Sequence, residues 1–362
     1  ITFILLWNPP NAFLATTSKL FAYFLTIICL YDTFFSIVEL NYTAVYPEMY
    51  PELKDRSAVT AYMQGLYMIG SLIGTALPPL IYGGLGWKYM GVILGVAIFL
   101  FKMISLLGIK EEKVYSLEVQ PSLWKSLSLT LKNKSFLAAV IANLLAIYAV
   151  NMITAIAPFY TKYVLNFAED KTSLFLAIMV LTSIPFLVIW SNFVVIKLGP
   201  KKSFIFSLIS LGILVLSAFT LSPQAAFITA VLIGIGLSGV ALVPYVVIAD
   251  VIDEDEVNNG VRREGMYFGI NGFVIRFAGI IQGGVIGLLL PAFGYVQGQI
   301  QQSETTILGF KIMMSIIPMV ALIIGALIIW KFYPLDGERL KKVKEMLADL
   351  HKKKKVKLPS EE

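Results

Sequence analysis

Nine long apolar runs divide this sequence, and they constrain the fold more than any other feature. Each run is about 20 residues long or longer, the length that an α-helix needs to cross a bilayer core of about 30 Å. The runs lack the two-residue alternation of membrane barrel strands. They predict an all-α polytopic membrane protein with nine complete spans. We expect these spans at residues 20–46, 59–82, 89–108, 136–160, 173–196, 203–221, 225–249, 266–292 and 306–332, with 1–7 as the end of another helix in an N-terminally truncated chain.

The composition agrees with a membrane protein and argues against an enzyme. Of 362 residues, 57% are hydrophobic and 14% charged, whereas soluble domains are about a quarter charged. The one cysteine, Cys29, can build neither a disulfide framework nor a cysteine metal site. The one histidine, His351, lies in a lysine-rich tail, where we expect a solvated side chain. Since the sequence shows no reactive triad, phosphate loop or metal cluster, we predict no catalysis and no cofactor beyond a coupling ion.

Lysine and arginine are unevenly distributed among the loops. Of these 29 residues, 22 lie in the loops 47–58, 109–135, 197–202 and 250–265 or in the tail from Lys331. Positive loops stay cytoplasmic, which places the C-terminus inside and predicts a multi-pass protein of the cell membrane. The net charge of +6 therefore indicates topology rather than nucleic-acid binding.

The longest loop suggests how the chain is divided. We expect the remainder of an N-terminal helical bundle at 1–108, a cytoplasmic inter-bundle loop at 109–135, a six-helix C-terminal bundle at 136–332 and a basic cytoplasmic tail at 333–362. A weak internal repeat supports two halves, because PELKDR and DEDEVNNGVRREG both place acidic residues and then arginine after an apolar helix. Parallel repeats of this kind occur in major facilitator transporters.

Two carboxylates interrupt the first complete span. Asp32 lies near its middle, and Glu39 follows seven residues later on nearly the same helical face, with Ser36 between them. A carboxylate in a low-dielectric core favours its protonated form. We therefore predict Asp32 and Glu39 as cation-coupling residues, and Asp32 and Ser36 as substrate ligands. The alternative is a structural pair that only holds the bundle together.

Arg276 lies in the span 266–292 with about ten uncharged residues on either side. A guanidinium at that depth costs about 2.5–3.5 kcal/mol and normally faces a bundle interior or a watery cavity. Gly272 lies one turn away and leaves room for a ligand. We predict that Arg276 and Gly272 bind substrate, together with the polar span residues Gln64, Asn143 and Asn151. Interhelical hydrogen bonding is the alternative for these polar residues.

Three further segments have distinct predictions. The charged loop after residue 249 is expected to form a cytoplasmic gate through Asp250, Asp253, Arg262, Arg263 and Glu264. The G-x-G-x-x-G motif at 234–239 lies inside an apolar span, so it predicts helix packing and not dinucleotide binding. The tail is either an amphipathic helix on an anionic membrane surface or a solvated charged segment. In the first case one apolar face contains Leu340, Val343, Met346, Leu347 and Leu350.

Several motifs resemble the glycoside–pentoside–hexuronide:cation symporters of the major facilitator superfamily. DVIDEDEVNNGVRREGMYFGI is similar to the family's signature between helices ten and eleven, and YDTFFSIVEL with PELKDR to its fourth helix and following loop. KLGPKKSF and YPLDGER resemble a basic loop and the start of the tail. The resemblance implies that the chain spans the end of helix three to helix twelve of a twelve-helix fold.

The resemblance also implies roles for individual residues. Asp32 matches an aspartate shared by the cation and sugar sites, and Arg276 matches a lysine that couples them. Cys29 stands where a sodium-using member has a hydroxyl, which favours H⁺ over Na⁺. Ser36 and Gln64 replace Trp and Arg of the melibiose type, which argues against galactosides.

The resulting hypothesis is a monomeric secondary transporter. It would couple a cation to the symport of a sugar, glycoside or related small solute by alternating access, in contact with membrane lipid. Two alternatives stay open, namely a lipid or lysolipid transporter of the same superfamily branch and a non-transporting membrane scaffold or receptor.

Overall fold

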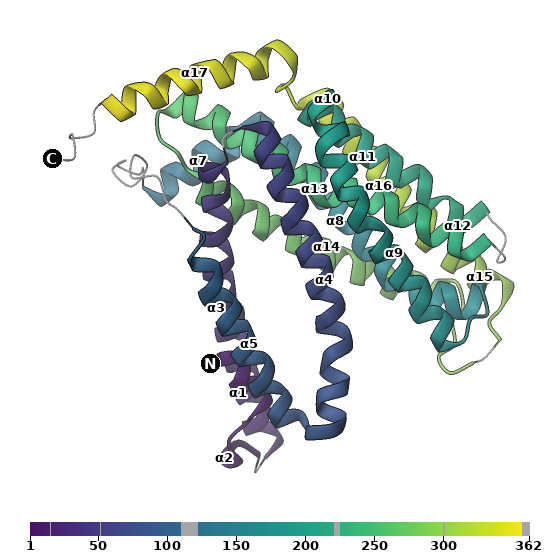
Figure 1. Cartoon of the computed structure of the whole chain (residues 1–362). Coiled ribbons are helices and arrows are strands. Elements are labelled where there is room, and N and C mark those ends of the chain that lie inside the picture. The colour runs from purple at the N-terminus through teal and green to yellow at the C-terminus, as the bar shows by residue number, and fades with distance from the viewer. Residues whose placement is uncertain (15, 51, 110–121, 221–224, 300, 357–362) are drawn as a thin grey trace. The chain divides into compact units, whose positions relative to one another are not determined.

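The computed structural model describes residues 1–362 except 15, 51, 110–121, 221–224, 300 and 357–362 (Figure 1). The described residues form helices and no strand, which confirms the all-α prediction. Eight helices of this described part are long and apolar enough to cross a membrane. The expected span 59–82 is also helical, within α4 (Leu53–Leu85), but α4 is not among these eight.

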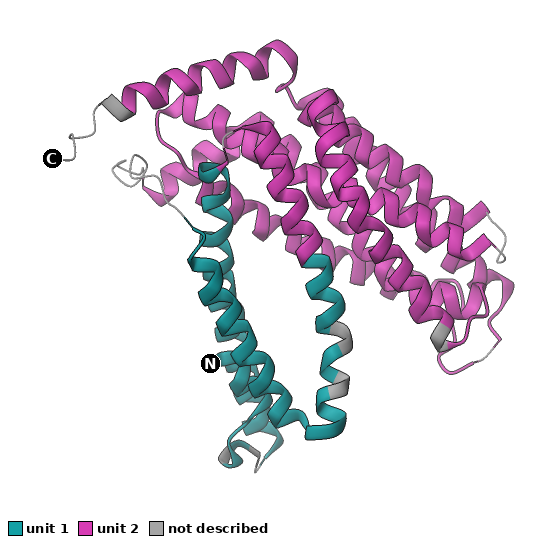
Figure 2. Cartoon of the chain, viewed as in Figure 1, with its two compact units in different colours: residues 1–49, 67–112 teal, residues 50–66, 113–362 magenta. Residues whose placement is uncertain are grey.

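The chain separates into two compact units (Figure 2). Unit 1 contains residues 1–49 and 67–112, and unit 2 contains 50–66 and 113–362. The helix α4 therefore contributes to both, with its first turns in unit 2 and the remainder in unit 1.

Unit 1 is built from a short helix packed on two long ones. α1 (Thr2–Trp7) contacts both α3 (Thr17–Met49) and α5 (Trp87–Leu106), and α2 (Asn11–Leu14) precedes α3. Gly91 and Gly95 of α5 lie where a Cβ atom would meet the side chains of Trp7 and Ile4. The Tyr23 hydroxyl donates to the carbonyl of Leu5 at 2.7 Å. These contacts hold α1 against both longer helices.

Unit 2 contains a bundle of six long helices. They are α8 (Lys134–Phe159), α9 (Glu169–Ile189), α11 (Pro200–Val215), α13 (Ala226–Asn259), α14 (Glu264–Ala292) and α16 (Ile317–Phe332). The π-helical segments η1 (Tyr160–Val164) and η2 (Trp190–Val195) extend α8 and α9, and η4 (Ile312–Ile316) joins α15 (Glu304–Lys311) to α16. The short helices α10 (Ile196–Leu198) and α12 (Ser217–Thr220) flank α11. α13 packs against α8, α9 and α11, and α8 against α14 and α16.

Glycines permit the closest approach inside this bundle. A Cβ atom on Gly239 would lie 2.5 Å from the ring of Trp190, and one on Gly236 would lie 2.8 Å from Leu211 Cα. Both distances are too short for a real side chain. The G-x-G-x-x-G motif is therefore a helix-packing motif, as predicted.

Two helices flank the bundle. α7 (Leu123–Lys132) occupies part of the expected loop 109–135, of which 110–121 lie outside the described residues. Ser126 and Thr130 lie four residues apart and are buried on one side of α7. α17 (Gly337–Val356) is formed by the tail and contacts α13 (Figure 1).

Candidate functional site

The C-terminal end of α13 carries five acidic residues within the stretch 250–256, and all five are buried. Asp250, Asp253 and Glu256 follow one another at a spacing of three, so they share one side of the helix. Asp255 points to a different side. Buried carboxylates are retained when they are paired and hydrogen-bonded, and here each of the five has a cationic partner.

Arg56 provides a fully buried cation to the first two carboxylates. Its Nη1 atom lies 3.2 Å from Asp250 Oδ1 and 3.0 Å from Asp253 Oδ2, and its side chain is 0% exposed. Its Nε atom donates to the carbonyl of Tyr50 at 3.0 Å. Ser57 holds this part of α4 against η2 through a hydroxyl contact with Ser191 Oγ at 3.1 Å. The sequence analysis did not select Arg56, although PELKDR places it in the internal repeat.

A glycine turn returns two further arginines to α13. Gly260 ends the helix with φ of 75° and donates to the carbonyl of Glu256 at 2.8 Å. Glycine adopts this left-handed conformation without steric cost. Arg262 then reaches Asp253 Oδ1 at 3.2 Å and Glu256 Oε2 at 2.6 Å. We name Arg56, Asp250, Asp253, Glu256 and Arg262 the α13 charge cluster.

Arg263 lies outside this cluster although it is adjacent to Arg262. It donates from Nε to Asp255 Oδ2 at 2.9 Å and from Nη1 to the carbonyl of Ser126 on α7 at 3.0 Å. Glu264, the last residue of the expected gating set, lies 3.6 Å from Arg262 Nε. The structure therefore groups Asp250, Asp253 and Arg262 and gives Arg263 a separate contact with α7.

The tail helix α17 supplies the remaining cations. Lys344 Nζ lies 2.7 Å from Asp250 Oδ1 and 2.6 Å from Asp253 Oδ2. His351 Nε2 lies 2.9 Å from Glu256 Oε1, and Lys354 Nζ lies 2.8 Å from the same oxygen. The prediction that His351 is a solvated tail residue is therefore wrong. The local lysine content could not reveal a partner that lies on a different helix.

Buried ion pairs such as those of the α13 charge cluster are costly to break. Removing one partner of a buried pair leaves an uncompensated charge and costs about 3–5 kcal/mol. Asp250 Oδ2 is buried and makes no hydrogen bond to any described residue.

Tyr333 lies close to these carboxylates. Burial raises the pKa of Tyr333 well above its ordinary value, and Asp250, Glu254, Asp253 and Asp336 raise it further. The phenol of Tyr333 therefore stays protonated and donates to the carbonyl of Val247 at 3.4 Å.

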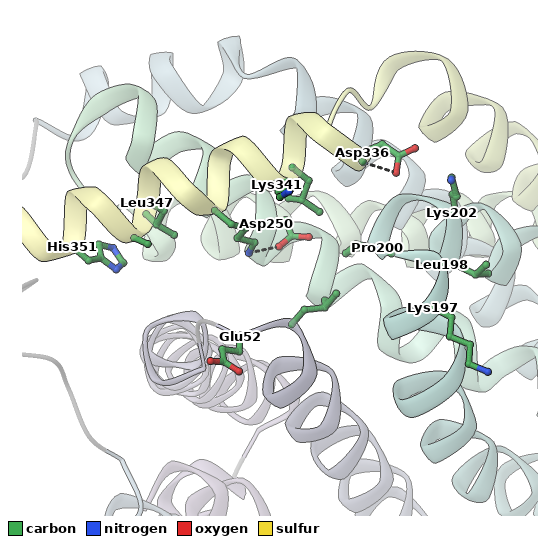
Figure 3. Close-up of a pocket in the computed structure, with 16 residues that line it drawn as sticks. Glu52, Lys197, Leu198, Pro200, Lys202, Asp250, Asp336, Lys341, Leu347 and His351 are labelled. Atoms are coloured by element: carbon green, nitrogen blue, oxygen red, sulfur yellow. Dashed lines mark hydrogen bonds and ion pairs between the residues drawn. The ribbon is translucent and has the colours of Figure 1, made fainter.

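A cavity of about 720 Å³ lies beside the cluster (Figure 3). α17 forms one wall with Lys341, Leu347 and His351. Another wall comes from α10 and α11, with Lys197, Leu198, Pro200 and Lys202. Asp250 is the cluster residue that lines it. The cavity shows that α17 is not packed continuously onto the bundle.

The acidic candidates of α3 lie in unit 1. Asp32 is exposed and Ser36 is half-buried. Glu39 Oε2 lies 3.2 Å from Lys102 Nζ of α5, which also lies 4.9 Å from the ring centroid of Tyr42. Lys102 and Glu39 are therefore paired within unit 1. The roles of Asp32, Ser36 and Glu39 in cation or substrate binding stay predictions.

The polar candidates of unit 2 include one buried pair. Asn143 Nδ2 of α8 donates to Asn271 Oδ1 of α14 at 3.0 Å, and both residues are buried. Asn151, Gln64 and Gly272 are half-buried, and Arg276 is exposed. The Asn143–Asn271 bond fits interhelical bonding, and substrate binding by Asn143, Asn151, Gln64, Gly272 and Arg276 stays a prediction.

Among the residues that the structure describes, this arrangement is a network of ion pairs and provides no reactive nucleophile. Among the described residues, no group of three or more His, Cys, Asp or Glu side chains could hold a metal ion. Eight described helices long and apolar enough to cross a membrane indicate a multi-pass membrane protein.

The family follows from a match to the model of the MFS/sugar transport proteins over residues 1–337. The chain belongs to this family of the major facilitator superfamily, so the resemblance to glycoside–pentoside–hexuronide:cation symporters is confirmed. The protein is a membrane transporter and not an enzyme.

Three curated relatives are distant from this chain, and their names are of two kinds. The chain is 26% identical over 337 residues to the "Putative sulfoquinovose importer" of Escherichia coli K12, covering 91% of this chain and 71% of that protein. It is 25% identical over 399 residues to the "Sodium-dependent lysophosphatidylcholine symporter 1" of Gallus gallus, covering 97% and 73% respectively. The "Glucuronide carrier protein homolog" of Escherichia coli K12 is 26% identical over 276 residues, covering 75% and 58%.

Proposed function

We propose that the protein couples a cation to the symport of a sugar, glycoside or related small organic solute by alternating access. Membership of the sugar transport family supports this proposal, as do the names of two relatives, an importer of sulfoquinovose and a glucuronide carrier homolog. The relative from Gallus gallus is named as sodium-dependent, which supports coupling to a cation without identifying the ion.

The contact between Arg56 and the carboxylates of α13 is the observation that carries the proposal. Alternating access needs a barrier that closes one end of the solute pathway and reopens in each cycle. Ion pairs suit this purpose because water and counter-charges replace them when the helices separate. Arg56 of α4 holds Asp250 and Asp253 at 3.2 and 3.0 Å, so breaking these pairs releases the start of α4 from α13.

Coupling would depend on the charges within the spans. We assign ion coupling to Asp32, with Glu39 as a second carboxylate, and solute recognition to Arg276. Arginine suits this role because its five fixed donors bind carboxylates and other polar oxygens. H⁺ is favoured over Na⁺ because the family resemblance places Cys29 where a sodium-using member has a hydroxyl.

We further propose that the protein is a monomer in the plasma membrane with its C-terminus in the cytoplasm. The distribution of lysine and arginine supports this orientation, because 22 of these residues lie in alternate loops and the tail. The α13 charge cluster would then close the cytoplasmic end of the pathway.

A lysolipid is the second candidate solute, because the relative from Gallus gallus is named as a lysophosphatidylcholine symporter. Such a solute would need a pathway that opens sideways to the bilayer with an apolar lining. A scaffold or receptor without transport would instead leave Asp32 and Arg276 dispensable for activity.

Uptake into proteoliposomes separates these possibilities. The reconstituted protein would be tested with radiolabelled glycosides, hexuronides, sulfonated sugars and lysophosphatidylcholine, under an imposed H⁺ or Na⁺ gradient. We expect uptake of a sugar-type solute driven by H⁺, and loss of uptake in Asp32→Ala. Uptake of lysophosphatidylcholine alone would favour the second candidate. Absence of gradient-driven uptake across the panel would contradict the symporter proposal.

A further inference from the structure

The cavity of about 720 Å³ beside the α13 charge cluster has both apolar and basic walls. Its apolar lining includes Leu53 of α4, Leu198 of α10, and Leu340 and Leu347 of α17. All the residues that line it belong to unit 2. Ligand pockets typically combine an apolar lining with a few placed polar groups. This cavity therefore suits a ligand with an apolar part and a charged part.

The positive charge of the cavity comes from several elements. Besides Lys344, it is lined by Lys197 of α10, Lys202 of α11 and Lys341 of α17 (Figure 3). These last three lysines are exposed, and none of them forms an ion pair with another residue that the structure describes. Lys197 Nζ lies 5.7 Å from the ring centroid of Phe193, which leaves its charge uncompensated. Lysine binds phosphate oxygens as a point charge, so the lining favours an anionic group.

The start of α11 adds to this positive charge. Gly199 is the N-cap of the helix and has no side chain to cap it, and Pro200 occupies the first position. The first N–H groups of a helix lack partners within the helix and attract anions. Both Gly199 and Pro200 line the cavity. The helix terminus and the lysines therefore favour the same kind of group.

Three carboxylates also line the cavity, and two of them have contacts within the chain. Asp336 Oδ1 accepts from the backbone of the next residue at 2.9 Å, and Asp250 Oδ1 lies 2.7 Å from Lys344 Nζ. Glu52 is exposed. The second oxygen, Asp250 Oδ2, is buried and has no hydrogen-bond partner among the described residues. A buried acceptor without a donor is costly, so a ligand hydroxyl at Asp250 would be favourable.

An exposed apolar stripe extends along α11 from Lys202. Phe206, Ile209 and Ile213 follow that lysine at spacings of four, three and four, so all four residues share one face. The three apolar side chains are 49%, 39% and 62% exposed. The segment Pro200–Thr220 is long and apolar enough to cross a membrane. This face of α11 can therefore lie against acyl chains, with a cavity lysine at its end.

We propose that this cavity binds an anionic phospholipid with a hydroxylated headgroup, of which phosphatidylglycerol is an example. Its phosphate interacts with Lys202, Lys341 and the start of α11, and a headgroup hydroxyl donates to Asp250 Oδ2. Its acyl chains lie along the exposed stripe of α11. The bound lipid joins α11 to α17. The proposal does not depend on solute transport, because it uses neither Asp32 nor Arg276.

Native mass spectrometry of the purified chain in detergent measures this binding directly. The probes are phosphatidylglycerol, phosphatidylcholine and phosphatidylmethanol with identical acyl chains. Phosphatidylmethanol has the charge of phosphatidylglycerol but no headgroup hydroxyl. We expect an apparent Kd for phosphatidylglycerol about tenfold lower than for phosphatidylcholine, and severalfold lower than for phosphatidylmethanol. Glycerol 1-phosphate, which has no acyl chain, should not displace the lipid.

Two double variants locate the site. Lys202→Ala/Lys341→Ala removes two lysines of the cavity, whereas Lys201→Ala/Lys342→Ala removes their neighbours, which do not line it. Only the first should abolish the preference for phosphatidylglycerol over phosphatidylcholine. Unfolding temperatures check that both variants are folded. Should the first be unfolded, the single change Lys341→Ala gives the same comparison with Lys342→Ala, since both lysines are exposed.

Four results would contradict the proposal in whole or in part. Equal affinity for phosphatidylglycerol and phosphatidylcholine would show that the cavity does not select an anionic lipid. Equal losses in the two double variants would assign binding to general surface charge. Complete displacement by glycerol 1-phosphate would identify a site for free phosphate groups and not for a lipid. Equal binding of phosphatidylglycerol and phosphatidylmethanol would remove Asp250 and the hydroxyl from the site.

Discussion

Arg56 and Asp253 are 197 positions apart in the sequence, yet Arg56 Nη1 lies 3.0 Å from Asp253 Oδ2 in a pair with almost no exposed surface. Lys344 approaches the same carboxylate oxygen at 2.6 Å from the tail helix. Three distant segments of the chain, the start of α4, the end of α13 and α17, thus depend on one aspartate.

This dependence predicts strong coupling between Arg56 and Asp253. Arg56→Ala should lower the free energy of unfolding by about 3 kcal/mol, because it leaves buried carboxylates short of a cation. The double variant Arg56→Ala/Asp253→Ala should lose less than the sum of the two single changes. Thermal unfolding in detergent measures these effects, and Lys54→Ala, an exposed neighbour on α4, is the matched control. Additive losses would show that the pair does not act as a unit.

Lys344 and Lys342 differ in position on α17 and should differ in effect. Lys344 contacts Asp250 and Asp253, whereas Lys342 is exposed. The measurement is thiol labelling in detergent of the variant Cys29→Ser/Leu347→Cys, which carries one thiol on the buried face of α17. Lys344→Ala should speed this labelling severalfold, since the tail loses its contact with both aspartates, while Lys342→Ala should leave the rate unchanged. An equal response in both variants would mean that general tail charge, and not this contact, holds the helix.

The helices were predictable from sequence, whereas the partners of the charged residues were not. Apolar runs of about 20 residues mark helices locally, and the charged stretch after residue 249 was visible as a dense group of acids and arginines. Arg56 was missed because no local pattern connects it with a helix nearly 200 positions away. The same reason applies to His351, whose contact with Glu256 depends on where the tail helix packs. Met346 was assigned to the apolar face but is exposed, because the contact surface covers only Val343 and Leu347 well.

Packing in the bundle of unit 2 predicts that one glycine is far less tolerant than another. A Cβ atom on Gly239 would lie 2.5 Å from the Trp190 ring, whereas one on Gly279 would meet nothing within 4 Å. Gly239→Ala should cost about 1–3 kcal/mol through overpacking, and Gly279→Ala should be near neutral. Unfolding temperatures in detergent compare the two. A loss of stability in Gly279→Ala as large as in Gly239→Ala would contradict this interpretation.

Asp32 and Arg276 carry the coupling part of the proposed function. Replacing either with Ala should abolish gradient-driven uptake, because the ion or solute loses its charged partner, while the amount of protein in the membrane stays unchanged. Lys311→Ala, a change at a lysine assigned no role in transport, is the control and should retain uptake. Uptake that persists in Asp32→Ala and Arg276→Ala would remove both residues from the mechanism.

The pair Asn143–Asn271 allows structural and functional roles to be separated. Asn143→Leu should destabilise the bundle by about 1 kcal/mol, because it leaves the amide of buried Asn271 without its donor. Asn143→Leu/Asn271→Leu removes both polar groups and should recover most of that loss. If Asn143 also binds solute, the double variant should be stable in detergent and yet show a raised KM for uptake. Restored stability with an unchanged KM would assign the pair to helix packing alone and remove Asn143 from the predicted substrate site.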